Sequence, residues 1–508
     1  MSSGHLEIER TYDLPDNATE LPDLVAATHG AVSAVSDVGT VELEATYVDT
    51  EDLQLIRRRA TLRRRTGGAD AGWHLKRPVN GDTRQEIHWP LGDSADVPDD
   101  VREALTALAP GAQLRPIVRV STSRERSVLR DASGVALAEL CDDHVRASRL
   151  DGSGSVMVWR EVEVELIDGS ESDLDAVQAA LHGVGAVRAA TSSKLARALA
   201  GHPAYRAPQP RVHDSGADAL SSYLREQADR LRWADVDLRL DPDGEGVHDL
   251  RVQARRLRTA LRVNRPLIDE TLGRRLEDEL RLLGRVLSPV RDRQVIHDLL
   301  ADRVSAAAPE RADHLLSLVH REEAPAEERI VSGMRAALNS ARYLRLLTEL
   351  DALADGDGLT AVAGEPAATV LLDGPRRVLR RLQRQASTVD SAAGPDQRTT
   401  RLHDVRKSAK TLRYACEVVE PVVGEPAQRL ALRAKRLQTV LGDHLDRVLL
   451  AEHLETLIRI PGLSAADGFT LGELHASLGA ELAADTEAHR EALRKVSSRK
   501  ASGWLRDS

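Results

Sequence analysis

The chain has 508 residues, of which 42% are hydrophobic and 30% charged, and its formal net charge is −10. At about 150 residues per domain, this length excludes a single small fold and predicts several domains. No apolar run approaches the roughly 20 residues that a membrane-spanning helix needs, and Glu7 and Glu9 stand where a signal peptide would place its apolar stretch. We therefore expect a soluble, cytoplasmic protein that does not enter a membrane.

Cysteines and aromatic residues are scarce. Cys141 and Cys416 lie far apart and cannot form a disulfide framework. Aromatic residues make up 2% of the chain, which argues against a stacking surface for single-stranded nucleic acid. The 70 lysines and arginines are clustered, and a cluster of this kind favours an anionic partner.

Residues 5–199 alternate between hydrophobic and polar side chains, as half-buried strands do. The clearest runs are 5–9, 41–45, 73–76, 86–89 and 161–166. Gly67-Gly68 and Gly81-Asp82 supply turns between them, and helical spacing interrupts the pattern over 100–108 and 173–181. These features predict a strand-rich α+β domain.

Residues 201–216 contain three prolines and lack periodicity, so they read as a linker. Beyond it, Ala, Leu, Arg and Glu recur at helical spacing up to about residue 500, which predicts an all-α domain packed as bundles. The strongest predicted helices are 219–233, 247–263, 275–287, 376–386, 402–419 and 429–441.

The helical half repeats itself. Val247-His248-Asp249-Leu250-Arg251 is similar to Leu402-His403-Asp404-Val405-Arg406, and a later pair of segments, 283–293 and 437–447, is similar as well. Chance similarity between helices rich in Arg and Leu does not readily align both His-Asp pairs. The repeat predicts two copies of one unit of about four helices in a pseudo-symmetric domain.

Each repeat carries a row of basic residues on one helix face, because the residues are spaced by three or four positions. The first row is His248, Arg251, Arg255, Arg258 and Arg262, and the second is His403, Arg406, Lys410 and Arg413. Like charges at this spacing do not stabilise a helix. Solvated faces balanced by acids are one interpretation, but two rows in equivalent positions favour a surface that binds an extended polyanion.

This doubled V/L-H-D-x-R-x-x-x-[RK]-x-L-R pattern resembles the CHAD family, over residues 217–500. The resemblance implies two four-helix bundles around a basic surface, with inorganic polyphosphate as the ligand. It also implies that eight residues line the phosphate path: His248, Arg251, Arg255, Arg258, His403, Arg406, Lys410 and Arg413. A later family motif is matched by Arg291 and Asp292, and by His444 and Asp446.

In the strand-rich half, carboxylates and cations share strand faces. The odd positions from His5 to Thr11 lie on one face, as do Glu161, Glu163 and Glu165. Arg63 and Arg65 share a face, as do His74 and Lys76, and Arg57 is expected to begin the same long strand as Arg63. If the sheet closes into a barrel, these rows meet in a charged tunnel that can hold a hard divalent cation and phosphate oxygens.

The same half resembles the CYTH family of triphosphate tunnel metalloenzymes, over residues 3–200. The resemblance rests on Glu7-Ile8-Glu9, Leu62-Arg63-Arg64-Arg65, Trp73-His74-Leu75-Lys76, the Glu161–Glu165 run and Ser193-Lys194-Leu195. It implies a closed, eight-stranded antiparallel barrel that cleaves triphosphates with Mg²⁺ or Mn²⁺. It further implies metal ligands at Glu7, Glu9, Glu161, Glu163 and Glu165, phosphate contacts at Arg57, Arg63, Arg65, Lys76 and Lys194, and catalytic roles for Glu7, Glu9 and Lys76.

Two features leave alternatives open. The family's E-x-E-x-K signature ends here in Thr11 instead of Lys, and Arg10 belongs to the other face of a regular strand. Further along, the inward face of one strand is either Arg119, Ser121 and Ser123 or, in the other register, Arg124 and Arg126. The absence of a lysine at position 11 is expected to slow turnover severely, because loss of a charge contact at a transition state commonly lowers the rate ~100-fold.

The leading hypothesis is a metal-dependent triphosphatase that hydrolyses inorganic triphosphate or polyphosphate ends, joined to a polyphosphate-binding helical domain. The alternative, favoured by Thr11, is a catalytically weak protein that binds or is targeted to polyphosphate. Nucleic acid is the less favoured partner for the basic helices. The expected layout is a tunnel domain at 3–200, a linker at 201–216 and a helical domain at 217–500.

Overall fold

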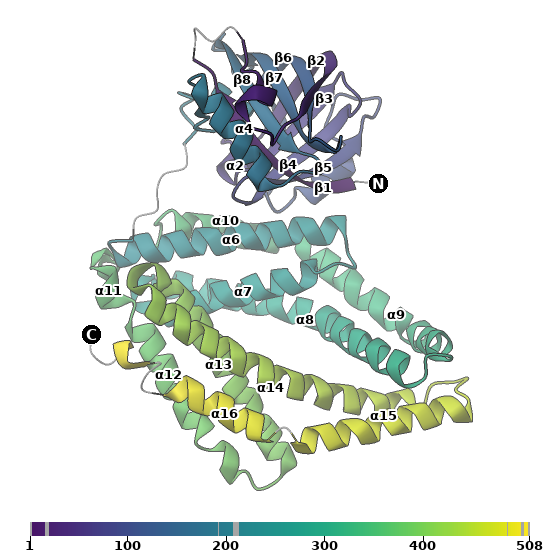
Figure 1. The fold of residues 1–508 in the computed structure, drawn as a ribbon. Coiled ribbons are helices and arrows are strands. Elements are labelled where there is room, and N and C mark those ends of the chain that lie inside the picture. Colours follow the sequence, from purple (N-terminus) through teal and green to yellow (C-terminus); the bar gives the residue numbers. More distant parts are fainter. Residues whose placement is uncertain are drawn as a thin grey trace. The chain divides into compact units, whose positions relative to one another are not determined.

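A computed structural model describes residues 3–15, 20–191, 193–206, 213–484, 486–498 and 502–505. The chain divides into two compact units, Met1–Gln209 and Pro210–Ser508 (Figure 1). The boundary falls within the segment 201–216 that the sequence marks as a linker.

The first unit is a closed antiparallel β-barrel. Hydrogen bonds join eight strands in the order β5-β4-β3-β2-β6-β7-β8-β1, and β1 pairs again with β5. The strands are β1 (Ser3–Asp13), β2 (Ala34–Asp49), β3 (Thr61–Thr66), β4 (Gly72–Asn80), β5 (Thr83–Pro90), β6 (Arg115–Arg130), β7 (Ala136–Arg149) and β8 (Val156–Leu166). A short strand, β9 (Val187–Arg188), extends the sheet beside β1. The expected eight-stranded barrel is confirmed.

In the described part of this unit, five helices accompany the barrel: α1 (Leu24–Ala27), α2 (Gln54–Arg57), α3 (Asp99–Ala104), α4 (Glu171–Gly183) and α5 (Lys194–Ala198). Helix α4 begins with a capping box between Ser170 and Asp173. Its apolar face packs with Tyr12, Val162 and Val164, which lie on the outer face of β1 and β8. Because strand side chains alternate between faces, the odd-numbered neighbours of these residues point into the barrel.

One end of the barrel interior is filled by apolar side chains. Tyr47, Val118 and Trp159 cluster there with Leu195 and Leu199 from the region of α5. Trp159 lies on the same strand face as Glu161 and donates a 2.6 Å hydrogen bond to it. The interior therefore changes from apolar to charged along its length, and α5 lies at the apolar end.

The second unit is built from helices in the described residues, which confirms an all-helical domain. They are α6 (Gly216–Leu240), α7 (Gly246–Val263), α8 (Glu270–Ala307), α9 (Ala312–Leu338), α10 (Ala341–Ala354), α11 (Ala367–Val370), α12 (Asp373–Ala386), α13 (Pro395–Val423), α14 (Glu425–Leu457), α15 (Ala465–Ala484) and α16 (Thr486–Ser497). Each helix that the sequence predicts lies within one of these. No helix in the described ranges combines the length and the hydropathy needed to cross a membrane.

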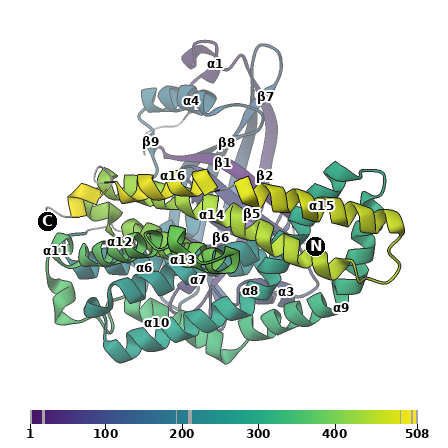
Figure 2. The same ribbon diagram turned by 90° about the horizontal axis from the view of Figure 1, so that it is seen from below.

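The sequence repeat corresponds to two helix pairs, α7 with α8 and α13 with α14, whose members pack side by side (Figures 1 and 2). Leu250 and Leu257 are fully buried on α7, and their counterparts Val405 and Leu412 are fully buried on α13. The same face of each repeat therefore points into the core, which leaves the basic face of each helix on the other side.

Candidate functional site

Lys76 on β4 is the cation around which the carboxylates of β1 gather. Its Nζ lies 2.6 Å from Glu7 and 2.8 Å from Glu9, and Glu9 also accepts a 3.0 Å hydrogen bond from Arg84 on β5. Burial lowers the pKa of Lys76, but Glu9 and Glu7 outweigh it and hold that pKa above its usual range. Lys76 is thus held as an ammonium group inside the barrel.

Glu86 on β5 joins the same network, although the sequence analysis gave it no role. It accepts a hydrogen bond from Arg63 on β3 at 3.3 Å and contacts His74 on β4. Lys76 is 3.9 Å away. Together with burial, Arg63 depresses the pKa of His74 to about 4, although the hydrogen bond to Glu86 opposes this. Glu86 pairs with His5 across β1 and β5, and residues paired in this way lie on the same face of the sheet. Because His5 and Glu7 share a face of β1, Glu86 points into the barrel together with Glu7.

Arg65 extends the cationic row of β3. Burial and the nearby Arg63 lower its pKa to about 10. Its guanidinium is paired with Asp70. The neighbouring guanidinium groups of Arg63 and Arg65 repel each other, and an anion bound between them would relieve this repulsion.

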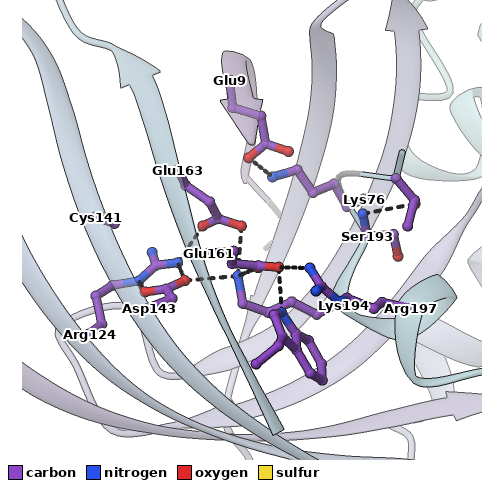
Figure 3. A network of polar contacts seen from close by, with 12 residues as sticks. Glu9, Lys76, Arg124, Cys141, Asp143, Glu161, Glu163, Ser193, Lys194 and Arg197 are labelled. Atoms are coloured by element: carbon purple, nitrogen blue, oxygen red, sulfur yellow. Dashed lines mark hydrogen bonds and ion pairs between the residues drawn. The ribbon is translucent and has the colours of Figure 1, made fainter. Parts of the chain in front are cut away.

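A second network surrounds Lys194, at the start of α5. Its Nζ lies 2.6 Å from both Glu161 and Glu163 and 2.8 Å from Asp143 (Figure 3). Ser193 caps α5 by accepting from the amide of Ala196, and this fixes the direction in which Lys194 enters the barrel. The ammonium group therefore occupies the centre of a three-carboxylate cage.

Arg124 on β6 completes this second network. Its Nη2 lies 2.6 Å from Asp143 and also contacts Glu163. Arg126 faces the same way and bonds Glu139, whereas Arg119 is exposed. The register with Arg124 and Arg126 inward is therefore the correct one. Arg124 and Asp143 are interior residues to which the sequence analysis assigned no function.

The expected metal ligands lie in two places. Among the described residues, two groups have the spacing to hold an ion: His5, Glu7 and Glu86, and Asp143, Glu161 and Glu163. Carboxylate oxygens are the donors that Mg²⁺ and Mn²⁺ prefer, so the barrel interior fits such an ion. Glu165 is on the same face of β8, and burial together with the charge of Glu7 raises its pKa to about 7.

Two residues differ from what the family motifs require. Arg57 ends the short helix α2 and is exposed, so the expectation that it begins the strand is wrong: β3 starts at Thr61. Thr11 points into the barrel, is 3% exposed, and its Oγ1 has no hydrogen-bond partner among the described residues. Arg10 faces the other way and bonds Asp82 and Asp175.

The helical unit contains a basic cavity of about 850 Å³ between α7, α8, α12, α13 and α14. Seven of the eight residues expected on the phosphate path line it: His248, Arg251, Arg255, Arg258, His403, Arg406 and Lys410. Arg262, Arg291, Arg377, Arg381 and Lys407 add to the lining, which has Asp292 and Asp446 as its carboxylates. Ten lysines and arginines against two aspartates make this cavity strongly positive.

Arg413 is not part of the cavity lining. Its Nε donates a 3.0 Å hydrogen bond to Glu417, which also pairs with Arg256 of α7 at 2.9 Å. Both guanidinium groups lie over the ring of Tyr414. The arginine that follows Lys410 in the motif therefore serves to join α13 to α7.

Comparisons with known proteins identify a domain family for each of the two units. A CYTH domain model matches residues 5–199, and a CHAD domain model matches residues 222–455. Two proteins of Mycobacterium tuberculosis, MT2285 and Rv2226, are 36% identical to the chain over 491 residues, which cover 93% of this chain and 92% of each relative. The chain belongs to the family of CYTH–CHAD proteins.

Two solved structures are similar to parts of the CYTH–CHAD protein. The CHAD domain from the plant Ricinus communis is 23% identical, covers 58% of this chain and 97% of its own, and has a TM-score of 0.41. HpAC1 from Hippeastrum, described as having a dominant triphosphatase activity, is 18% identical, covers 40% of this chain and 100% of its own, and has a TM-score of 0.25. CYTH domains are metal-dependent, and the acidic groups of the barrel could bind a metal.

Proposed function

We propose that this CYTH–CHAD protein is a metal-dependent triphosphatase that hydrolyses inorganic triphosphate or the ends of polyphosphate, and that its CHAD unit binds polyphosphate. The observation that carries the proposal is the barrel interior, where Lys76 and Arg63 face the same space as Glu7 and Glu9. A closed wall with both kinds of charge suits an anionic substrate that arrives with a divalent cation.

Different residues of the barrel would bind the phosphate groups and the metal ion. Arg63, Lys76 and Arg124 would bind phosphate oxygens, and Glu7 and Glu9 would hold Mg²⁺ or Mn²⁺. The ion, when bound, neutralises charge that develops on the phosphoryl oxygens and positions a water for in-line attack. Water attacks the terminal phosphorus and the bridging P–O bond breaks, so that triphosphate and water yield orthophosphate, pyrophosphate and, near neutral pH, a proton.

The apolar end of the interior favours entry of a chain end. Trp159, Tyr47 and Leu195 fill the barrel beside the charged section, so a polyphosphate cannot pass through this end as an extended strand. A substrate that enters from the charged end alone presents its terminal phosphates to Lys76 and Arg124. This arrangement supports release of phosphate from an end of the chain.

Phosphate release from inorganic triphosphate by the full chain, with Mg²⁺ or Mn²⁺, tests the proposal. Glu9→Gln should lower kcat/KM by ~100-fold or more, because it removes a buried carboxylate of the interior. Glu44→Gln on β2 makes the same change on an exposed, outward position and should leave the rate unaltered. No release with either metal, or equal rates for wild type and Glu9→Gln, would contradict the enzyme assignment.

Thr11 supports a second candidate, a catalytically weak protein whose role is to bind polyphosphate. The interior position that the family signature gives to a lysine is occupied here by a hydroxyl that has no hydrogen-bond partner among the described residues. Under this candidate, wild type releases phosphate slowly and Thr11→Lys accelerates it. If Thr11→Lys leaves a fast wild-type rate unchanged or lowers it, the second candidate fails.

The basic cavity supports the binding half of the proposal. Arg251→Glu and Arg406→Glu should weaken polyphosphate capture while leaving triphosphate turnover largely intact. Arg335→Glu, on an exposed part of α9 outside the cavity, is the matched control. Capture should persist when equal concentrations of RNA are added, and displacement by RNA would show that nucleic acid is the better ligand.

A further inference from the structure

Of the two lysines that line the basic cavity, Lys407 pairs with Asp404, whereas Lys410 has no ion pair among the described residues. It lies on α13 within the lining, and no hydrogen bond or ion pair joins it to any of the described residues. Arg251 and Arg406 in the same cavity are paired with Asp292 and Asp446. An amine in such a site can give up its proton, whereas a guanidinium group cannot.

The cavity that holds Lys410 is lined by nine other lysines and arginines, from α7, α8, α12 and α13, against Asp292 of α8 and Asp446 of α14. Arg251 and Arg255 face it from α7, and Arg406 faces it from its own helix. Asp446 on α14 is the acid that faces it, and Arg406 shares this acid at 3.8 Å. Burial first, and then the charges of Arg255, Arg406 and Arg251, lower the pKa of Lys410 to about 6.

We propose that the cavity takes up a proton at Lys410 when it binds a polyanion, so that capture strengthens as the solution becomes less alkaline. This inference rests on the proposed binding of polyphosphate by the CHAD unit. In the free cavity most Lys410 side chains are neutral above pH 7, since this is above their pKa. Phosphate oxygens placed among the guanidinium groups cancel the repulsion that expels the proton.

The direction of the pH effect follows from linkage. The bound state holds one more proton than the free state at any pH between the free pKa of about 6 and the higher pKa of the complex. Affinity therefore falls as pH rises through this window, by up to about tenfold per pH unit for uptake of one full proton. Below pH 6 the lysine is already charged and this dependence ends.

Other groups that titrate can be separated by the choice of conditions. His248 and His403 also line the cavity, and burial lowers the pKa of both in the free chain; both are retained in Lys410→Arg, so any proton that they take up appears equally in wild type and in that variant. The internal phosphates of a long polyphosphate are fully ionised in this range, and only its two ends titrate. The difference between wild type and Lys410→Arg, measured between pH 7 and 9 with a long chain, therefore isolates Lys410.

The test is calorimetric titration of the full chain with long-chain polyphosphate, at pH 7.5 in two buffers of different ionisation enthalpy. We expect wild type to take up close to one proton per site more than Lys410→Arg, whose side chain stays charged. Lys407→Arg is the matched control, because Lys407 lies on the same helix and lines the same cavity but is exposed and paired with Asp404. It should keep the wild-type uptake.

Three results would overturn the inference: tight binding by wild type without proton uptake, an unchanged pH slope in Lys410→Arg, or loss of the slope in Lys407→Arg. A second measurement needs no polyphosphate. Brief acetylation with acetic anhydride, carried out from pH 5 to pH 11, labels only the neutral amine, so the rate at Lys410 should rise with its amine fraction and reach half its plateau near pH 6. If wild type fails to bind polyphosphate but the acetylation profile is centred near pH 6, the proposed function fails and the neutral lysine stands; a profile centred near pH 10 overturns the inference itself.

Discussion

The ammonium group of Lys76 lies 2.8 Å from the carboxylate of Glu9, although the two residues are on strands β4 and β1, which do not pair with each other. Strand β5 lies between them in the sheet. The contact therefore spans the curved inner wall of the barrel, and a flat sheet would keep the two side chains apart. Closure of the barrel is what turns separate rows of charge into one site.

Replacing Lys76 with methionine should lower kcat/KM for triphosphate by ~100-fold or more, because it removes an interior cation from the phosphate site. It also leaves Glu7 and Glu9 without their shared partner, which costs on the order of 3 kcal/mol of unfolding free energy. Steady-state kinetics and urea denaturation measure the two effects. Arg77→Met changes the next residue of β4, which bonds Gln85, and should leave kcat/KM within about twofold; equal losses in both variants would contradict the role of Lys76.

The raised pKa of Glu165 predicts how the unfolding free energy of the barrel depends on pH. Its pKa is about 7 in the folded chain, above the ~4.3 of an unfolded glutamate, so folding favours its protonated form. This contribution is present at low pH and is lost as pH rises from about 4 to about 7. In wild type the unfolding free energy should therefore fall by an amount on the order of 2 kcal/mol across that window, and Glu165→Gln should abolish this fall.

Denaturation of wild type and Glu165→Gln from pH 5 to pH 8, with a chelator present, isolates this contribution. The fluorescence of Trp73 and Trp89, which are buried in the barrel, reports the relevant transition. Glu44→Gln on the outer face is the control and should follow the wild-type curve. Parallel curves for wild type and Glu165→Gln would show that Glu165 is ionised in the folded barrel throughout this range.

Much of the fold follows from residue periodicity. Alternation over residues 5–9 and 161–166 places Glu7, Glu9 and Glu163 on faces that the structure shows inside the barrel. The spacing of His248, Arg251 and Arg255 likewise gives the helix face that lines the cavity. Local periods are enough here because one side of each element is buried and the other is not.

Contacts between distant residues could not be predicted from local patterns. The cage of Asp143, Glu161 and Glu163 around Lys194 depends on where α5 enters the barrel, and no single segment shows this. The choice between Arg119 and Arg124 depended on register, and a shift of one residue reverses every side chain. Arg57 was misplaced because the strand begins four residues later, after α2.

Arg406 and Arg413 lie on either side of Lys410 in the basic motif but differ in their surroundings. Arg406→Met should weaken polyphosphate binding by roughly tenfold, since Arg406 lines the cavity. Arg413→Met should leave that affinity within about twofold and instead lower the unfolding free energy by about 1–2 kcal/mol, because it breaks the bond to Glu417 and the contact with Tyr414. Titration and thermal denaturation measure the two quantities, and a comparable loss of affinity in both variants would place Arg413 on the phosphate path.

Asp292 and Asp446 are the carboxylates of the cavity lining, at equivalent positions of the two repeats, and each pairs with an arginine: Arg251 at 2.8 Å and Arg406 at 3.8 Å. A bound polyanion must compete with them for these guanidinium groups. Asp292→Asn and Asp446→Asn should therefore each tighten polyphosphate binding by about 2- to 5-fold, as expected for loss of a partly solvated charge. The gain should shrink at high salt, because the interaction is screened.

Titrations at two ionic strengths check this expectation. Asp443→Asn is the control for Asp446→Asn, since Asp443 is on the same helix but exposed and outside the cavity lining, and its effect should be smaller. Weaker binding in Asp292→Asn and Asp446→Asn would give the aspartates the opposite role. They would then hold Arg251 and Arg406 in the orientation that binds phosphate, and the cavity would gain more from fixed guanidinium groups than it loses to nearby negative charge.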